Sequence, residues 1–384
     1  MVFSGKYSIV GVGCSRFGKI QGVSTMGFTL EAAKRALEDA GLGRDEVDGV
    51  LVLMPAVMGE QHGWASRVAS FLGIEPTFCA TMDLGGATAC AMAQTAAAAI
   101  EAGYCRTVLC CFATQNWPQG VELRLFGSEF QVPYGDVGAM TFMAHLKRRQ
   151  QYEWGYPDEV YGTIAVTWRR HAQQNPEAQM RKPMSLEDYF ASRWVVEPLR
   201  LFDCCPNTDG GGAFVVTSTE RGRDLAKPPV RILGAGQSHS SEIIRPAGAS
   251  DSHWGGKKAA EQVYRSAGVG PTDLSFAQIY DAFTPRVVHD VVAYGFCAPH
   301  EVADFVLEGN LDFGGRLPSN TAGGLLSEGH LSGFGHVREA VRQLRGECGP
   351  RQVPNAELGL VTGYGGAPHE APPTVSYSAL VLAR

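Results

Sequence analysis

Two stretches of this sequence, AAKRALEDAGLGRDEVDGVLV (residues 32–52) and AAEQVYRSAGVGPTDLSFAQI (residues 259–279), align with each other without a gap. Each begins with Ala-Ala, continues as an amphipathic segment, stops at Ala-Gly-x-Gly and ends in an apolar run. In the first copy, apolar residues recur every three to four positions and Gly41 follows them, which is typical of a helix and its C-terminal stop. The alignment therefore predicts an internal duplication, each copy being a helix, a short link and a strand.

The duplication extends beyond these two stretches. A Gly-Gly pair at 85–86 precedes a small-residue helix and the strand TVLCCF, and a second pair at 323–324 precedes the helix GHVREAVRQLRG and the strand ELGLVTG. Each half thus repeats strand, helix, strand, turn, helix, strand, which predicts two related α/β units with short connections. We place the halves at residues 1–225 and 226–384, and we expect the two Gly-Gly turns to face one shared cleft.

A segment of different composition interrupts the first half at about residues 115–205. It is rich in tryptophan, tyrosine and pairs of basic residues, and parts of it have helical periodicity. We interpret it as a loop domain that is inserted into the first half and lies over the duplicated core, where function often concentrates.

The composition excludes several classes of protein. The chain has 384 residues, 45% of them hydrophobic, and a formal net charge of -6, so it lacks the basic excess of a nucleic-acid-binding protein. Its first residues do not resemble a signal peptide, and its longest apolar stretch (87–102) contains Gln94 and Glu101. We therefore expect a cytoplasmic protein with no membrane span. The ten cysteines include no C-x-x-C pair, and the histidines show no ligand spacing, so no metal site of its own is expected.

Four motifs together resemble the thiolase superfamily. The stretch NTAGGLLSEGHLSGFGH (320–336) is similar to the family signature of Asn, Gly-Gly and Gly-His, and it places His330 at the catalytic histidine. IYDAFTP (279–285) resembles the Asn-Glu-Ala-Phe segment, NTDGGGAFVV (207–216) the Asn-Asp-Gly-Ala-Ala segment, and TGYGG (362–366) lies where a Cys-Gly motif closes the family's chains. The resemblance implies a duplicated five-layer α/β/α/β/α fold, a homodimer, and a loop insertion that binds coenzyme A.

The chain departs from the family at the reactive positions. The family pattern places Gly86 at the nucleophilic cysteine, Tyr364 at the second cysteine and Tyr280 at the asparagine. Without a thiolate at a helix start, where the dipole lowers the pKa of a thiol, acyl transfer through an enzyme thioester has no first step. Cys90 lies four residues after Gly86, on the same helical face. It is either a displaced nucleophile or a small buried thiol.

A site that keeps an acyl-CoA cradle and a histidine but has no nucleophile suits reactions through a thioester enolate. Retro-aldol cleavage needs a base for the β-hydroxyl, donors for the enolate oxygen and an acid for the carbon. The chain most resembles the nucleophile-lacking, lipid-transfer-protein branch of the superfamily. That implies a lyase of the aldolase type that cleaves a β-hydroxyacyl-CoA, for example a steroid side-chain thioester, into a carbonyl product and acetyl- or propionyl-CoA.

The same resemblance implies partners and site residues. It implies an OB-fold partner of the DUF35 type, any zinc belonging to that partner, and no cofactor beyond the coenzyme A of the substrate. Tyr280 is expected to be the general base or acid, and His330 the enolate oxygen donor or proton shuttle. Tyr364 is expected to be exposed by a glycine turn as a third reactive group, and Asp281 to orient a partner or cap the following helix. The backbone amides of the oxyanion site and the residues that line it are expected at Gly86, Gly366, Asn320 and Gly324.

Two other functions remain open at this level. The first is a thiolase or acyltransferase that uses Cys90 or another cysteine, and the second is a non-catalytic acyl-CoA or sterol carrier. A trapped acyl-enzyme would favour the first, whereas full function after substitution of Tyr280 and His330 would favour the second.

Overall fold

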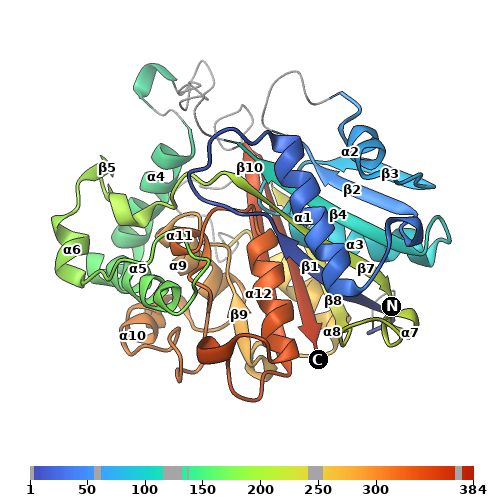
Figure 1. Ribbon diagram of the computed structural model, residues 1–384. Helices are drawn as coiled ribbons and strands as arrows, with labels where there is room; N and C mark the ends of the chain where they lie inside the picture. The colour runs from blue at the N-terminus through green and yellow to red at the C-terminus, as the bar shows by residue number, and fades with distance from the viewer. Residues whose placement is uncertain (1–3, 56–61, 116–131, 136–137, 241–253, 368–373) are drawn as a thin grey trace.

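The computed structural model describes residues 4–55, 62–115, 132–135, 138–240, 254–367 and 374–384 (Figure 1). The segments 116–131 and 136–137 of the expected insertion lie outside the described residues. The helices are α1 Thr25–Ala40, α2 Trp64–Leu72, α3 Thr88–Glu101, α4 Ala139–Trp154, α5 Asp158–Gln173, α6 Leu186–Ala191, α7 Thr219–Gly222, α8 Lys257–Ala267, α9 Thr284–Ala293, α10 Val302–Leu307, α11 Gly324–Ser327 and α12 Phe334–Arg345. The strands are β1 Tyr7–Cys14, β2 Gly49–Leu53, β3 Phe78–Met82, β4 Thr107–Thr114, β5 Trp194–Val196, β6 Leu199–Arg200, β7 Gly210–Ser218, β8 Val230–Ser240, β9 Phe276–Gln278, β10 Leu358–Ala367 and β11 Thr374–Ala383.

The strand order repeats between the two halves of the chain. The main sheet has the order β3-β2-β4-β7-β1-β8-β11-β10-β9. In the first half β2 is parallel to β4, and β7 is antiparallel to both β4 and β1. In the second half β9 is parallel to β10, and β11 is antiparallel to both β10 and β8. The run β2-β4-β7-β1 is therefore matched by β9-β10-β11-β8, and the predicted duplication is confirmed in the fold.

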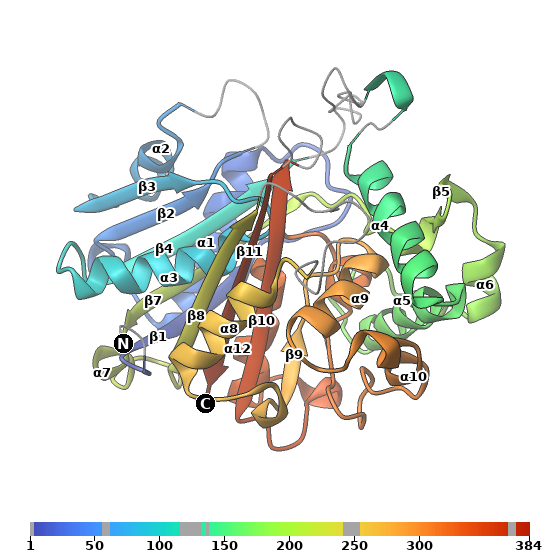
Figure 2. The same cartoon turned by 180° about the vertical axis from the view of Figure 1, so that it is seen from behind.

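Helices cover and separate the two halves of this sheet in five layers. α1 packs on the outer face of β1, β4 and β7, and α8 packs on β8 and β11. α3 and α12 lie between the halves, because each contacts strands of both (Figures 1 and 2). The α3 sequence TACAMAQTAAAAIE is rich in alanine, which lets the helix fit between the two halves of the sheet with most of its side chains buried. The expected five-layer α/β/α/β/α arrangement is confirmed.

The two aligned stretches fold as their sequences predict. α1 ends at Gly41 and α8 ends at Gly268, both in the left-handed conformation with φ of 71° and 72°. Each helix is followed by a short 3-10 turn and then by β2 or β9. The shared Ala-Gly-x-Gly therefore ends both helices for the same backbone reason.

The expectation for the two Gly-Gly turns is only half right. The Gly85-Gly86 turn opens α3, as predicted. The turn that meets it is at Gly333, before α12, where a Cβ would lie 3.1 Å from the Gly86 carbonyl oxygen. The pair at 323–324 opens only the four-residue α11. The loop between α11 and α12 separates this pair from the helix that the alignment assigned to it.

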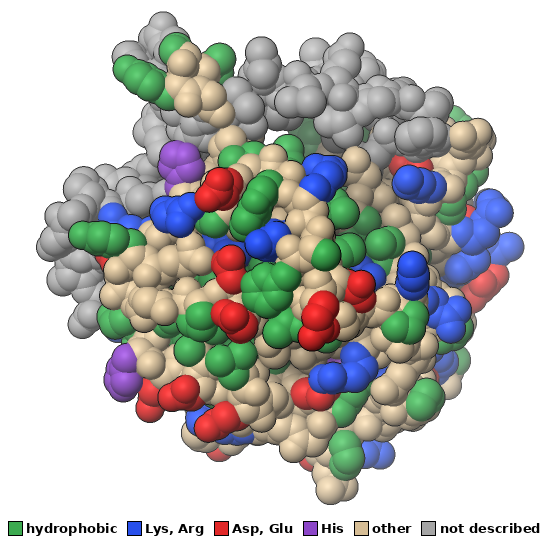
Figure 3. Space-filling view, turned by 90° about the vertical axis from the view of Figure 1, so that its left-hand side faces the viewer, with side chains coloured by type: hydrophobic (Ala, Val, Ile, Leu, Met, Phe, Trp, Pro, Cys, Tyr) green, Lys and Arg blue, Asp and Glu red, His purple; other side chains and the backbone are tan. Residues whose placement is uncertain are grey.

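The described part of the insertion is a helical layer against the second half. α4 and α5 pack on α9, and α5 also contacts α10 and α11. On this face, acidic and basic side chains are interspersed (Figure 3). No helix among the described residues is long and apolar enough to cross a bilayer.

Candidate active site

The structure brings together Tyr280, Tyr364 and His330 from three separate segments. Tyr280 follows β9, and its backbone N–H donates to Thr362 Oγ1 in β10 at 2.9 Å. His330 lies in the loop between α11 and α12, where its backbone N–H donates to Thr208 Oγ1 at 2.9 Å. The Tyr280 hydroxyl lies 3.3 Å from His330 Nε2, and the ring centroids of Tyr280 and Tyr364 are 6.3 Å apart. The three predicted reactive residues therefore form one cluster.

The phenol of Tyr280 fills the space beside Gly86. A Cβ built on Gly86 would lie 2.0 Å from Tyr280 Oη and 2.1 Å from Cζ. No side chain fits at residue 86 while Tyr280 holds this position, because real Cβ contacts of this kind are never so short. The resemblance places the thiolase nucleophile at residue 86, so a phenol hydroxyl from the end of β9 stands where that side chain would begin.

Both tyrosines of the cluster are phenols at neutral pH. Burial raises the pKa of Tyr280 and the nearby Cys205 adds to the rise, while burial also raises the pKa of Tyr364 against the opposing charge of Arg286. The Tyr280 hydroxyl keeps its proton and lies within hydrogen-bond distance of His330 Nε2, where the imidazole tautomer sets which group donates. This arrangement favours acid over base chemistry for Tyr280, a choice that the sequence left open.

His330 is neutral under the same conditions. Burial lowers its pKa below the ordinary value of 6.5, although the Asp281 carboxylate opposes this shift. The side chain is half-buried, whereas Tyr280 and Tyr364 are 4% and 8% exposed. His330 is therefore the solvent-accessible member of the cluster and a neutral acceptor.

Tyr364 differs from its expected setting. The sequence predicts a glycine turn that exposes the phenol, but Tyr364 lies within β10 and is buried, since TGYGG continues the strand against β11. Its hydroxyl has no hydrogen-bond partner among the described residues. A buried hydroxyl without a partner costs about 1–3 kcal/mol, so this oxygen is available to a bound ligand.

A buried cation beneath Tyr364 was not anticipated from the sequence. The Arg286 guanidinium, on α9, lies 4.6 Å from the centroid of the Tyr364 ring and pairs with Asp290. Asp290 Oδ2 in turn accepts a hydrogen bond from Thr362 Oγ1 at 3.1 Å, and that hydroxyl holds the Tyr280 backbone. One network thus positions both tyrosines. The i,i+4 spacing of Arg286 and Asp290 in TPRVVHD was the signal that could have revealed it.

Asp281 does not cap the following helix. Its carboxylate accepts hydrogen bonds from the backbone N–H groups of Leu325 and Leu326, at the start of α11, at 2.9 and 3.3 Å. It also pairs with His336 Nε2 at 3.0 Å. This contact raises the pKa of His336 although burial opposes the rise. Asp281 therefore fixes the segment that carries His330, and the helix that it caps is α11, which lies far along the chain.

Asn320 and Gly324 are enclosed within the fold. The Asn320 side chain is hydrogen-bonded on both sides to the backbone of Ile279, at 2.7 and 2.8 Å. A Cβ on Gly324 would lie 2.1 Å from Asp281 Oδ2 and 2.7 Å from Trp168 Cδ1. Both residues connect the Tyr280 segment to the Gly-His loop, and their expected role as substrate contacts stays a prediction.

The two glycines expected to supply oxyanion amides lie close together. A Cβ on Gly85 would lie 3.2 Å from the Gly366 nitrogen, and one on Gly365 would lie 2.6 Å from the Gly86 nitrogen. The start of α3 thus runs directly against β10, where only glycine permits this approach. The oxyanion role of Gly86 and Gly366 stays a prediction.

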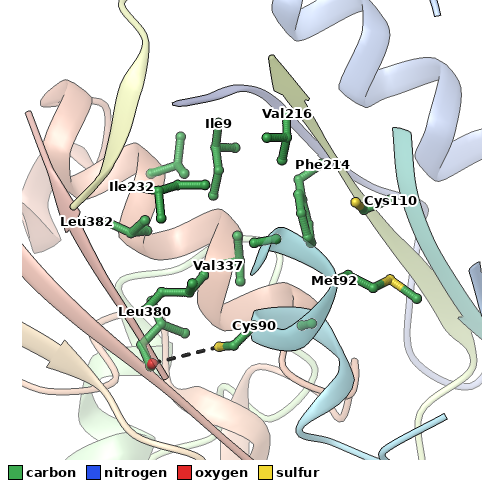
Figure 4. Packing of buried hydrophobic residues seen from close by; sticks show 14 of the residues in the cluster. Ile9, Cys90, Met92, Cys110, Phe214, Val216, Ile232, Val337, Leu380 and Leu382 are labelled. Carbon is green, nitrogen blue, oxygen red and sulfur yellow. Dashed lines mark hydrogen bonds between the residues drawn. The ribbon is translucent and has the colours of Figure 1, made fainter. Parts of the chain in front are cut away.

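Cys90 is packed inside the central layer. It is 2% exposed, its thiol contacts the Val361 carbonyl oxygen at 3.7 Å, and Val337 and Leu380 lie around it (Figure 4). Burial raises the pKa of its thiol to about 12, so the thiolate needed by a nucleophile is scarce at neutral pH. The geometry favours the buried-thiol alternative over the displaced nucleophile.

We therefore expect Cys90→Ala to leave the catalytic activity within about twofold of the wild-type value, because a buried thiol of raised pKa is not an available nucleophile. Steady-state kinetics and intact-mass spectrometry after incubation with the substrate measure this. A covalent acyl adduct on Cys90 would contradict it.

The described residues contain no group of three or more histidine, cysteine, aspartate or glutamate side chains that could hold a metal ion.

Comparison with known proteins agrees with this geometry. Residues 236–375 match the family described as "Thiolase C-terminal domain-like". The "Steroid side-chain-cleaving aldolase" of Thermomonospora curvata is 37% identical over 96% of this chain and 97% of its own length. The chain belongs to the thiolase-like aldolase family. The resemblance seen in the motifs is confirmed, and so is the expected activity class of a lyase acting on acyl-CoA.

Two further relatives support the assignment. The "17-hydroxy-3-oxo-4-pregnene-20-carboxyl-CoA lyase" of Mycobacterium tuberculosis is 36% identical over 96% of this chain and 98% of its own length. The solved structure named "Ltp2-ChsH2(DUF35) aldolase" matches with a TM-score of 0.88 at 36% identity, over 99% of this chain and 98% of that one. The family thus includes enzymes named for cleaving CoA esters.

Proposed function

We propose that this aldolase-family chain cleaves a β-hydroxyacyl-CoA by a retro-aldol reaction and forms no acyl-enzyme. The observation that carries the proposal is the position of the Tyr280 hydroxyl, which excludes a side chain at Gly86 and is hydrogen-bonded to His330. A thiolase needs a nucleophile at that position, whereas a retro-aldolase needs an acid and a base. The Tyr280–His330 pair supplies both.

In this mechanism one proton moves from the substrate oxygen to the substrate carbon. Neutral His330 accepts the proton of the β-hydroxyl as the bond between the α- and β-carbons breaks, which releases a carbonyl compound and leaves a thioester enolate. Tyr280 donates its proton to the α-carbon and regains one from His330. The free hydroxyl of Tyr364 and the amides near Gly86 stabilise the enolate oxygen. The products are the carbonyl compound and a shortened acyl-CoA, and no proton is gained or lost.

The substrate we propose is a steroid side-chain CoA thioester with a hydroxyl at the β-carbon. Of two relatives that share more than a third of their residues with this chain, one is named for cleaving a steroid side chain and the other for a 17-hydroxy steroid carboxyl-CoA. Loss of the side chain would release acetyl- or propionyl-CoA.

We also propose that the chain works as a homodimer together with an OB-fold partner of the DUF35 type. The partner is supported by the name of the solved structure at 36% identity, an aldolase with a DUF35 component, and the homodimer by the resemblance to thiolases. Co-expression with such a partner, followed by light scattering of the purified complex, tests both.

Product analysis tests the reaction itself. The complex is incubated with 17-hydroxy-3-oxo-4-pregnene-20-carboxyl-CoA, and the products are separated by liquid chromatography and mass spectrometry. Release of a 17-ketosteroid and propionyl-CoA in equal amounts is expected. Formation of a shortened acyl-CoA only when free coenzyme A is added would indicate a thiolase, and no turnover under any condition would favour a carrier.

The pH profile tests the role of His330. Because burial lowers the pKa of this imidazole, its neutral form persists below the ordinary value. We expect kcat to be constant near neutral pH and to fall on the acid side with an apparent pKa below 6.5. His330→Asn should remove this acid limb together with most of the activity. An unchanged limb in the variant would assign the titration to another group.

A further inference from the structure

Arg169 is a buried cation without a counter-ion. It lies on α5 and is 5% exposed, and the other buried cations among the described residues each pair with a carboxylate, namely Lys147, Arg286, Arg338 and Arg351. Arg169 instead donates from Nε to Ser327 Oγ at 3.0 Å and from Nη1 to the Lys182 carbonyl oxygen at 3.3 Å. No acidic side chain of the described chain pairs with it. A buried charge is costly unless it is paired, so this arrangement requires a reason.

The reason lies in a cavity of about 130 Å³ that Arg169 lines. Its walls are almost entirely apolar and include Met184, Phe202 and Leu326, with Leu201, 39% exposed, on its outer side. Methionine side chains in such a wall adapt to irregular ligands. The cavity is thus an apolar chamber with one fixed positive group.

This cavity shares a wall with the active site. Cys205 lines it and also packs against the hydrophobic cluster that contains Tyr280 and Tyr364. The Cys205 backbone N–H donates to the Ala282 carbonyl oxygen at 3.0 Å, two residues after Tyr280. The chamber and the tyrosine cluster are therefore neighbours, separated by the segment that carries Cys205.

The chemistry of the chamber selects its ligand. Nε and one N–H of Nη1 are engaged, which leaves the second N–H of Nη1 and both N–H groups of Nη2 without a partner among the described residues. A carbonyl oxygen on an otherwise apolar group fits free donors in a wall that is otherwise apolar. A cavity of about 150 Å³ holds a benzene ring, and this chamber of about 130 Å³ is slightly smaller, so it has room for one ring at most.

We propose that this chamber receives the end of the acyl group remote from the thioester, a six-membered ring whose carbonyl oxygen accepts a hydrogen bond from Arg169 Nη2. The inference rests on the proposed function and names the part of the substrate that the site selects. The 3-oxo group in the name of the Mycobacterium tuberculosis relative lies on such a ring.

The test measures binding and so does not depend on cleavage. The probes are 3-oxo-4-pregnene-20-carboxyl-CoA and its analogue without the 3-oxo group, and neither carries the 17-hydroxyl that cleavage requires. Titration calorimetry with wild-type protein should give a Kd lower for the 3-oxo thioester by on the order of tenfold to a hundredfold. Arg169→Met should bind both thioesters equally. The matched control is Arg170→Met, on the same helix, where the side chain is half exposed and pairs with Asp312; it should retain the full preference.

Each other outcome overturns the inference. Equal binding of the two thioesters by the wild type would show that the carbonyl is not recognised, and a preference that survives in Arg169→Met would place its recognition elsewhere. If Arg169→Met does not fold, Arg169→Lys decides, because a lysine keeps the charge but not the planar donor set; it should lose most of the preference. Failure of the proposed function would be seen in a separate measurement, because the 17-hydroxy thioester would then not be cleaved.

Discussion

Replacing Tyr280 with phenylalanine is expected to lower kcat by about a thousandfold, within the range of 10²–10⁴ that a positioned acid or base contributes. The hydroxyl is the only group removed, and it is the atom that lies 3.3 Å from His330 Nε2 and beside Gly86. The ring remains packed against Tyr364, so we expect KM and the melting temperature to change little. Steady-state kinetics with the cleavable thioester and thermal melting measure these quantities.

Tyr264→Phe is the matched control for this change. Tyr264 also donates its phenol hydroxyl within the fold, to the Tyr294 carbonyl oxygen at 2.9 Å, but it lies on α8. Its substitution should leave kcat within about twofold and cost on the order of 1 kcal/mol of stability. Equal losses of kcat in the two variants would mean that the Tyr280 hydroxyl acts only in packing, and full activity of Tyr280→Phe would show that this hydroxyl is not the acid of the reaction.

Local sequence patterns predicted much of this fold because the same pattern occurs twice. The Ala-Gly-x-Gly stops at Gly41 and Gly268 need only a left-handed residue after a helix, a requirement visible in the chain itself. The sequence did not predict the α11 turn, because the side chains that pack against Gly324, those of Asp281 and Trp168, come from other parts of the chain. Contacts between distant segments leave no local periodicity.

The sequence predicted which residues form the reactive cluster, but it did not predict what surrounds them. Motif positions identified Tyr280, His330 and Tyr364, but exposure and protonation depend on what packs around each ring. Tyr364 was expected to be exposed because glycines flank it, yet those glycines serve to let β10 run against Gly85 and Gly86. Arg286 lies six residues after Tyr280, and only the fold shows that it lies beneath Tyr364.

Replacing Gly86 with alanine is expected to destabilise the protein and inactivate it together. The added Cβ would lie 2.0 Å from Tyr280 Oη, and Tyr280 is only 4% exposed, so its ring would have to shift within a packed interior. Overpacking of this kind costs about 1–3 kcal/mol, and a displacement of about 1 Å at the reacting group costs about a hundredfold in rate. Gly86 does not have a positive φ, so backbone strain does not contribute. Thermal melting and kcat measure the two effects.

Two further variants separate this steric contact from a general intolerance of substitution. Gly43→Ala, at an extended residue with φ of -80° whose Cβ would meet nothing nearer than 3.8 Å, should change neither stability nor rate. In a Tyr280→Ala background the Gly86→Ala change should cost almost no additional stability, because the atoms that it meets are gone. If Gly86→Ala costs the same in both backgrounds, residue 86 must be glycine for another reason. The phenol would then not be what replaced the nucleophile, and the argument for a reaction without an acyl-enzyme would lose its main structural support.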